Sequence, residues 1–316
     1  MVKQETYTFN SADGHSVIHC RRWLPEAAPV AVLQLVHGMV EYIERYDEFA
    51  TYLAEQGYLV VGHDHIGHGH SVASVEELGV MTGDHPQEYM VADIYTHYTM
   101  VRAEQPDIPY FILGHSMGSY MLRKFLADKS EQIGSITGAI IMGTGMEKQA
   151  TCNAGLAIIN ATIALRGKNY RSAFIRDNTY SKPYKRYDCY GKDYTNSWLS
   201  CNTASVEKYY HDPLCTYMFT ANAYKALVET TRYVCSVNTM ARMRHDMPLL
   251  VVSGQDDPVG NLGQGTTMAA DAMREAGVTD VTLKLYPGDR HEILNELDRA
   301  TVMADIYAWM ESKRQA

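Results

Sequence analysis

The sequence predicts an α/β fold, in which helices cover both faces of a parallel sheet. Short runs rich in Val, Ile, Leu and Tyr recur along the 316 residues, each followed closely by glycine. Continuous apolar runs of this kind are typical of buried parallel strands. Helical patterns separate several of the runs, which indicates β-α alternation. The expected strands are 30–36, 59–62, 110–113, 139–142 and 249–252, and the expected helices are 45–55, 87–104, 117–128, 264–275 and 293–310.

Composition excludes several classes of protein. Hydrophobic residues make up 46% of the chain and charged residues 21%, which excludes a disordered or collagen-like chain. The net charge of −9 argues against general nucleic-acid binding, which needs a basic footprint. Residues 1–10 lack the apolar core of a signal peptide, and no stretch approaches the roughly 18 apolar residues of a membrane span. The six cysteines form no CxxC pair, so we expect reduced thiols in a cytoplasmic protein.

The β-α alternation stops between about residues 144 and 234. This stretch is rich in Tyr, Asn, Lys and Arg and shows no strand-helix rhythm. We interpret it as an insertion, folded as a mostly helical cap over the edge of the sheet where function collects. The expected organisation is a core of residues 1–143, a cap or lid of residues 144–234, and a second core part of residues 235–316.

A GxSxG motif carries the chemistry. Gly114-His115-Ser116-Met117-Gly118 directly follows the expected strand 110–113 and opens the expected helix 117–128. A strand before and a helix after are the context that a nucleophilic serine on a strained turn requires. The glycines permit the tight turn, and the helix N-terminus favours negative charge beside the serine. The motif therefore predicts that Ser116 is a nucleophile.

A serine hydroxyl needs a general base and an acid that orients the base. In this architecture the acid and then the histidine follow the serine in the chain. The strand 249–252 ends in an acidic loop with Asp256 and Asp257, and His291 is the one histidine beyond that loop. We therefore predict His291 as the base. Pro258 favours an extended Asp257, but the residues alone do not separate the two aspartates.

The transition state needs two backbone N–H groups as an oxyanion hole. His37-Gly38-Met39 follows the expected strand 30–36, and Gly38 permits a sharp turn there. The expected donors are the amides of Met39 and Met117.

Together these residues resemble the α/β-hydrolase superfamily, and within it the monoacylglycerol lipase and lysophospholipase group of serine aminopeptidase-like hydrolases. The matching segments are HGMVEYIERYDEFA (37–50), GHDHIGHGHS (62–71), ILGHSMGS (112–119), SGQDDPVG (253–260) and YPGDRHEILNE (286–296). The resemblance implies a mostly parallel eight-stranded sheet with a helical cap, and it places the acid on Asp257. It also implies hydrolysis of esters of single-acyl lipids (monoacylglycerol or lysophospholipid) or short acyl esters through an acyl-serine. No metal or cofactor is implied.

Several alternatives stay open. A peptidase or amidase could use the same scaffold, and a non-catalytic binding protein is a further alternative. The histidines of 63–70 suggest a metal site, although the resemblance assigns them to a structural loop in which His65 and His68 bond loop backbone. The apolar run 154–165 either admits acyl chains or packs on the core. A basic cluster is either a solvated face or a transient contact with an anionic headgroup or membrane surface; its members are Arg166, Lys168, Arg171, Arg176, Lys182, Lys185 and Arg186. The oligomeric state is not predicted.

Overall fold

Eight strands form one sheet in the computed structural model, which describes residues 2–134, 136–180 and 182–315. Their spatial order is β1-β2-β4-β3-β5-β6-β7-β8, in which β1 and β2 pair antiparallel and every pair from β4 to β8 is parallel. The predicted eight-stranded, mostly parallel sheet is confirmed. The strands are β1 (Lys3–Asn10), β2 (Val17–Leu24), β3 (Ala31–Val36), β4 (Tyr58–His63), β5 (Tyr110–His115), β6 (Ile136–Met142), β7 (Leu249–Gly254) and β8 (Val281–Tyr286).

Burial along each strand follows its position in the sheet. Every residue of β3, β4, β5 and β7 is buried, as the continuous apolar runs predict. The edge strands β1 and β8 instead alternate between more and less exposed residues, because one of their faces meets solvent. The continuous central strands bring their carboxyl ends to one edge of the sheet.

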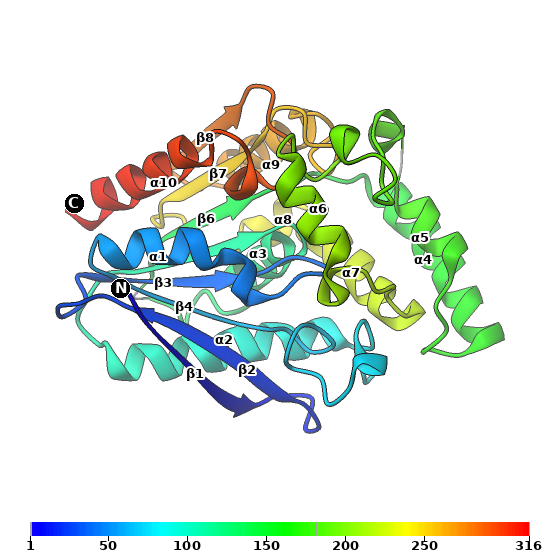
Figure 1. The fold of residues 1–316 in the computed structure, drawn as a ribbon, viewed down its shortest axis with the longest axis horizontal. Coiled ribbons are helices and arrows are strands. Elements are labelled where there is room, and N and C mark those ends of the chain that lie inside the picture. Colours follow the sequence, from blue (N-terminus) through cyan, green and yellow to red (C-terminus); the bar gives the residue numbers. More distant parts are fainter. Residues whose placement is uncertain (1, 135, 181, 316) are drawn as a thin grey trace.

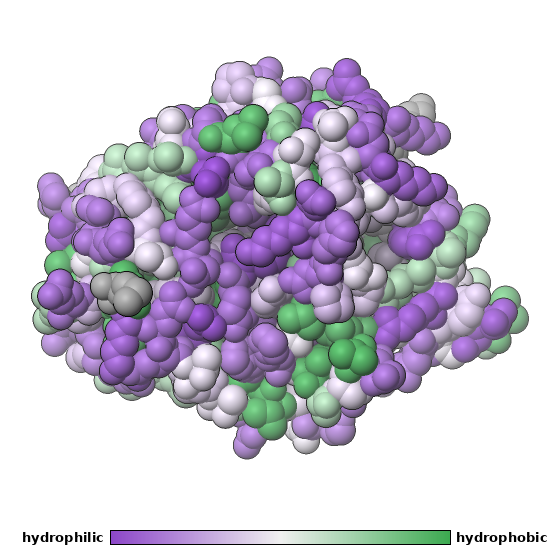
Figure 2. All heavy atoms as spheres, viewed as in Figure 1, coloured by the Kyte–Doolittle hydropathy of each residue, from purple (hydrophilic) through white to green (hydrophobic). Residues whose placement is uncertain are grey.

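Helices cover the sheet on both faces and bury two separate cores. The helices α2 (Pro86–Glu104), α3 (Met117–Asp128) and α9 (Gln264–Glu275) pack on one face. On the other face lie α1 (Asp47–Glu55) and α10 (Arg299–Arg314), which Figure 1 shows side by side. The outer surface seen in Figure 2 is mostly hydrophilic, with small, scattered hydrophobic areas, in keeping with the net charge of −9.

The chain between β6 and β7, which we call the β6–β7 segment (residues 143–248), is mostly helical. It lies beyond the arrowheads of β3 and β6 in Figure 1, at the carboxyl edge of the sheet. Among the described residues, no helix is both long and apolar enough to cross a bilayer. The segment contains α4 (Gln149–Arg166), α5 (Ala173–Thr179), α6 (Thr203–His211), α7 (Ala221–Val234) and α8 (Val237–Met240), with short 3₁₀ helices at Lys182–Arg186, Tyr194–Asn196 and Pro213–Cys215.

Two predicted helices were wrong at their starts. The chain makes a short 3₁₀ turn at Ile43–Tyr46 before α1 begins at Asp47. It makes another at Ile293–Asn295, and α10 begins only at Arg299. The second break has a clear cause, because the Glu296 carboxylate turns inward and accepts the amide N–H groups of Arg290 and Cys201. A continuous helix would carry that carboxylate away from both amides.

Candidate active site

Ser116 stands at the sharp turn between β5 and α3. Its backbone has φ 53° and ψ −122°, in the left-handed half of dihedral space that non-glycine residues rarely occupy. A side chain at Gly118 would collide with the backbone carbonyls of Val36 and His37, because α3 begins directly against the end of β3. Strain of this kind is found at functional sites, where it fixes one reactive side chain. The turn holds Ser116 at the carboxyl edge of the sheet.

His291 and Asp257 meet beside this edge although they lie in different loops. The Nδ1 atom of His291 is 3.1 Å from each carboxylate oxygen of Asp257. Both side chains are buried, and no described group hydrogen-bonds the Nε2 atom of His291. Among the described contacts, no side-chain hydrogen bond joins Ser116 to His291. His291 and Ser116 line the same cavity.

The environment of Asp257 keeps its carboxylate ionised. Burial alone would raise the pKa of Asp257, but the charge and hydrogen bond of His291, together with the hydrogen bonds of Ser253 and Val259, lower the pKa below its ordinary value. The Ser253 hydroxyl and the Val259 amide add two further hydrogen bonds of 2.8 Å to the carboxylate. The neighbouring Asp256 uses its backbone carbonyl to accept the Tyr187 hydroxyl. Of the two adjacent aspartates, the structure brings Asp257 to His291.

The loop after β3 packs directly against the serine. A side-chain carbon added at Gly38 would lie 3.0 Å from Cβ of Ser116 and 2.5 Å from Oε1 of Glu41. The Gly38 amide donates to that Glu41 oxygen. Met39 lines the cavity, and no described group occupies the amide N–H of Met39 or of Met117. The amides of Met39 and Met117 stay the predicted oxyanion donors.

A cavity of about 340 Å³ opens over Ser116 and His291. The β6–β7 segment supplies most of its wall, and aromatic side chains dominate that part. The indole of Trp198 stacks on the imidazole of His291, with ring centres 5.0 Å apart and an angle of 28°. Helix α4 packs against α7 and gives the cavity no described lining residue. The aromatic lining residues are Tyr180, Tyr190, Tyr194, Trp198, Tyr209, Tyr210, Tyr217 and Tyr224.

The histidines after β4 bond loop backbone. His65 contacts the His37 carbonyl at 3.2 Å and His68 contacts the Ile66 carbonyl at 3.0 Å, as the sequence led us to expect. Burial lowers the pKa of His68 to about 4, so its ring is neutral. The His65 contact joins the loop after β4 to the loop after β3, whereas the His68 contact lies within the loop after β4.

Another group has the composition of a metal site. Donor atoms of His19, Glu44 and Asp64 lie within 4.8 Å of one another. The Asp64 carboxylate already accepts the amides of Ile43 and His70, at 2.7 Å each, and the Arg21 guanidinium contacts Glu44. The charge of Arg21 offsets that of Glu44, and the bonds of Asp64 join the turn at Ile43 to the loop after β4.

The residues of the predicted basic cluster have different partners in the structure. Arg171 donates to the carbonyls of Leu78, Glu76 and Met218 and so ties the β6–β7 segment to the core. Arg176 pairs with Asp177 and lines the cavity. The side chain of Lys182 lies outside the described part of the chain. Arg171 therefore has a structural role of its own.

The sheet order, the strained serine turn and the two-faced helical cover define the fold as that of an α/β-hydrolase. The serine aminopeptidase S33 family matches residues 27–298, and the chain belongs to this family. The mouse (Mus musculus) monoglyceride lipase is 26% identical over 96% of this chain and 89% of its own length. The monoacylglycerol lipase of Mycolicibacterium smegmatis is 25% identical over 92% and 91%. A thermostable carboxyl esterase from Bacillus coagulans, solved with glycerol, superposes with a TM-score of 0.89 at 24% identity, over 99% of this chain and all of its own.

Proposed function

We propose that this chain is a serine esterase that hydrolyses carboxylic esters of single-acyl lipids (monoacylglycerol or lysophospholipid) or related short acyl esters. The observation that carries the proposal is the contact of His291 Nδ1 with both carboxylate oxygens of Asp257. His291 also lines the same cavity as Ser116. The curated relatives named as monoglyceride lipases support an ester substrate.

The geometry supports the following role for each residue. Ser116 attacks the ester carbonyl while Nε2 of His291 takes the hydroxyl proton, and Asp257 holds the imidazole tautomer and stabilises the imidazolium. The Met39 and Met117 amides stabilise the tetrahedral oxyanion, at about 3 kcal/mol per donor. His291 then protonates the leaving alcohol, and it next activates the water that attacks the acyl-serine.

The cavity supports compact substrates. Its volume of about 340 Å³ lies near the lower end of the range for small-molecule sites. Its wall carries tyrosine rings and hydroxyls, and α4 contributes nothing to it, so the described cavity favours short acyl groups over long ones. We propose that the β6–β7 segment, including the predicted insertion 144–234, acts as the cap that selects the acyl group.

A lipid substrate would bring the same segment to a membrane. We propose a transient contact through α4 and α5, which expose Leu165 (82%) and Phe174 (62%). The exposed Arg166 directly follows Leu165 in the chain. Replacing Leu165 and Phe174 by aspartate should reduce cosedimentation with anionic vesicles and leave hydrolysis of a water-soluble ester unchanged.

We also propose a cytoplasmic location. The six cysteines are free and five of them are buried. Burial raises the pKa of four of these thiols above the ordinary value, which keeps them protonated and unreactive. Unpaired thiols are typical of reducing compartments. Fractionation of the native cells tests the location.

Two measurements test the enzymatic proposal. A fluorophosphonate probe should label the purified chain and fail to label Ser116→Ala, whereas a binding protein would not react. Activity on p-nitrophenyl esters of increasing chain length, monoacylglycerols and lysophospholipids should exceed activity on aminoacyl-p-nitroanilides. Faster cleavage of the anilides would favour the peptidase alternative, and labelling that survives Ser116→Ala would refute the assignment of the nucleophile.

A further inference from the structure

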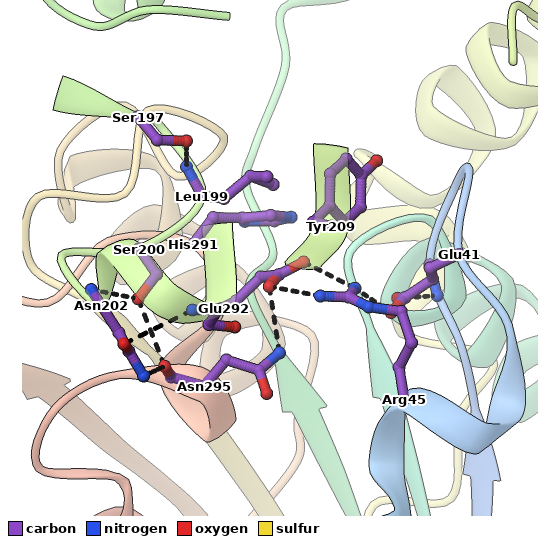
Figure 3. Close-up of polar contacts among 12 residues, drawn as sticks. Glu41, Arg45, Ser197, Leu199, Ser200, Asn202, Tyr209, His291, Glu292 and Asn295 are labelled. Atoms are coloured by element: carbon purple, nitrogen blue, oxygen red, sulfur yellow. Dashed lines mark hydrogen bonds and ion pairs between the residues drawn. The ribbon is translucent and has the colours of Figure 1, made fainter. Parts of the chain in front are cut away.

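Four charged side chains form a buried network behind Ser116. Glu41, Arg45, His115 and Glu292 have side chains that are only 5 to 11% exposed. Figure 3 shows Arg45 between the two glutamates. Its guanidinium is 2.9 Å from Glu41 and makes two contacts of 2.7 Å with the carboxylate of Glu292. Charges so far from water need partners, and here each carboxylate has one.

His115 completes this network with both ring nitrogens. Its Nδ1 lies 3.1 Å from the Glu41 carboxylate, and its Nε2 lies 3.3 Å from the backbone carbonyl of His291. Both oxygens are acceptors, so each needs an N–H donor from the ring. A neutral imidazole carries only one N–H and could serve only one of them. Two acceptors on opposite sides of the ring therefore favour the doubly protonated, cationic form.

Electrostatics agree with this protonation state. Burial alone would lower the pKa of His115, but the hydrogen bond and charge of Glu41, aided by the charge of Glu292, raise the pKa above its ordinary value. Burial would likewise raise the pKa of Glu41, but His115 and Arg45 lower it. Two cations then face two carboxylates.

The network joins the loops that would perform the chemistry. Glu41 accepts the Gly38 amide on the loop after β3 and the Tyr46 hydroxyl. Glu292 directly follows His291, and its amide donates to the Leu199 carbonyl in the β6–β7 segment. His115 directly precedes Ser116 and reaches the backbone of His291.

We propose that His115 is a positioning residue that works as a cation, tying the backbone of His291 to the Glu41 carboxylate and so keeping the general base and the oxyanion loop in place around Ser116. The effect of His115 on turnover rests on the proposed esterase function. Its charge state does not. A displacement of about 1 Å in such a site can cost about 10²-fold in rate.

Loss of the His115 proton should therefore lower activity at alkaline pH. A neutral ring would direct a lone pair at one of two oxygens and release that loop. The groups that face His115 are the carboxylates of Glu41 and Glu292, the Tyr46 ring at 6.4 Å and the His291 ring at 4.7 Å. Removing the charge of Glu41 removes the strongest stabilisation of the cation, so Glu41→Gln should move the alkaline loss of activity to lower pH.

The charge state can be measured without any substrate. In the Ser116→Ala chain labelled with ¹⁵N in its 13 histidine rings, the His115 signals are those absent from a second variant carrying His115→Gln. We expect both ring nitrogens of His115 to be protonated at neutral pH, and one to lose its proton when Glu41→Gln is added. A neutral His115 in the parent chain overturns the proposal, whatever the enzymatic activity.

The positioning role is tested by kinetics on a short p-nitrophenyl ester. Glu41→Gln should lower kcat by about 10²-fold with little change in KM, and it should shift the alkaline limb of kcat to lower pH. Glu292→Gln, which leaves the Gly38 and Tyr46 contacts intact, should shift the limb in the same direction by a smaller amount. Glu104→Gln, at an exposed carboxylate paired with Arg22, is the matched control and should behave as the parent chain.

Thermal unfolding identifies variants that fail to fold. If Glu41→Gln does not fold, Glu292→Gln carries the test. Suppose that Glu41→Gln or Glu292→Gln folds but loses kcat at the same alkaline pH as the Glu104→Gln control. That result overturns the positioning role, even if His115 proves cationic. If instead no variant, including the parent chain, hydrolyses any ester or reacts with fluorophosphonate, the proposed function fails while the NMR result stands.

Discussion

The guanidinium of Arg45 holds both carboxylate oxygens of Glu292 at 2.7 Å, across 247 positions of the chain. A paired, planar contact of this kind fixes orientation as well as distance. It joins the turn before α1 to the loop that carries His291. The same arginine stacks over the ring of Tyr209 at 4.8 Å, and the Tyr209 hydroxyl donates to the Val40 carbonyl.

Arg45→Ala should be strongly destabilising. It leaves the buried Glu292 carboxylate without the cation that contacts it and removes one of the two cations that contact Glu41. Breaking a buried pair in this way costs about 3–5 kcal/mol. Urea unfolding should show this loss of free energy. Arg299→Ala removes an ion pair with the mostly exposed Glu48 and should cost about 0–1 kcal/mol. Equal losses for the two variants would mean that the Arg45 network adds no stability.

Asp257→Asn should lower kcat by about 10³- to 10⁴-fold. Asparagine keeps the shape but cannot hold the His291 tautomer that leaves Nε2 free to accept the serine proton. Steady-state rates on a p-nitrophenyl ester measure the loss. The control is Asp256→Asn, whose contact with Tyr187 uses the backbone carbonyl and survives the change. A greater loss at position 256 would reverse the assignment of the acid.

Stability should fall as the solution is acidified below about pH 6.5. Burial lowers the pKa of five histidines, so the unfolded chain binds protons that the folded chain does not. Their contribution to stability is present above the ordinary histidine pKa of 6.5, and it is lost as pH falls toward the depressed values, about 4 for His68 and about 3 for His97. The five residues are His37, His63, His65, His68 and His97.

The slope of this dependence gives the test. His68→Gln should make the fall in unfolding free energy between pH 6.5 and 4 shallower by up to about 1.4 kcal/mol per pH unit, which is one proton. His245→Gln changes an exposed ring, so the slope of unfolding free energy against pH should equal that of the parent chain. A slope that is identical in all three chains would show that His68 is not a buried neutral group.

Trp198→Ala should reduce kcat more than it raises KM. The indole stacks on His291, and such aromatic pairs contribute about 0.5–1.5 kcal/mol beyond the area they bury. Trp198→Phe should restore most of the rate, because it keeps a ring against the imidazole. Trp309→Phe, at a tryptophan on α10 that packs in the core, is the control. A change in KM alone would assign Trp198 to substrate binding.

The sequence was sufficient for the central sheet and for the family, both of which the structure and the comparisons confirm. Ser116 and His291 could be predicted because each follows a strand of the parallel part of the sheet, and the ends of those strands meet at one edge. The choice of Asp257 over Asp256 needed the family resemblance as well. The catalytic roles of Ser116, Asp257 and His291 stay predictions. The helix expected over 293–310 was wrong because Glu296 has a tertiary partner, which local periodicity cannot register.

The charge network could not be predicted for a related reason. Glu41 and Arg45 are four residues apart in one segment that carries the family resemblance, and Glu292 lies in another, but spacing within each segment says nothing about the pairing between them. The tyrosines of 144–234 were visible as a composition bias, yet their assembly into one cavity wall depends on irregular turns that lack a periodic signal.

The β6–β7 segment has consequences for engineering because it is anchored to the core at loops that carry or adjoin the predicted catalytic residues. The Leu199 carbonyl accepts the amide N–H of Glu292. The Tyr187 hydroxyl donates to the Asp256 carbonyl, and the Tyr209 hydroxyl donates to the Val40 carbonyl. Exchanging this segment for that of a relative would therefore transfer a new substrate preference only if these three anchor points were kept. A graft designed from the cavity-lining residues alone would lose these three hydrogen bonds and loosen the loops that they anchor.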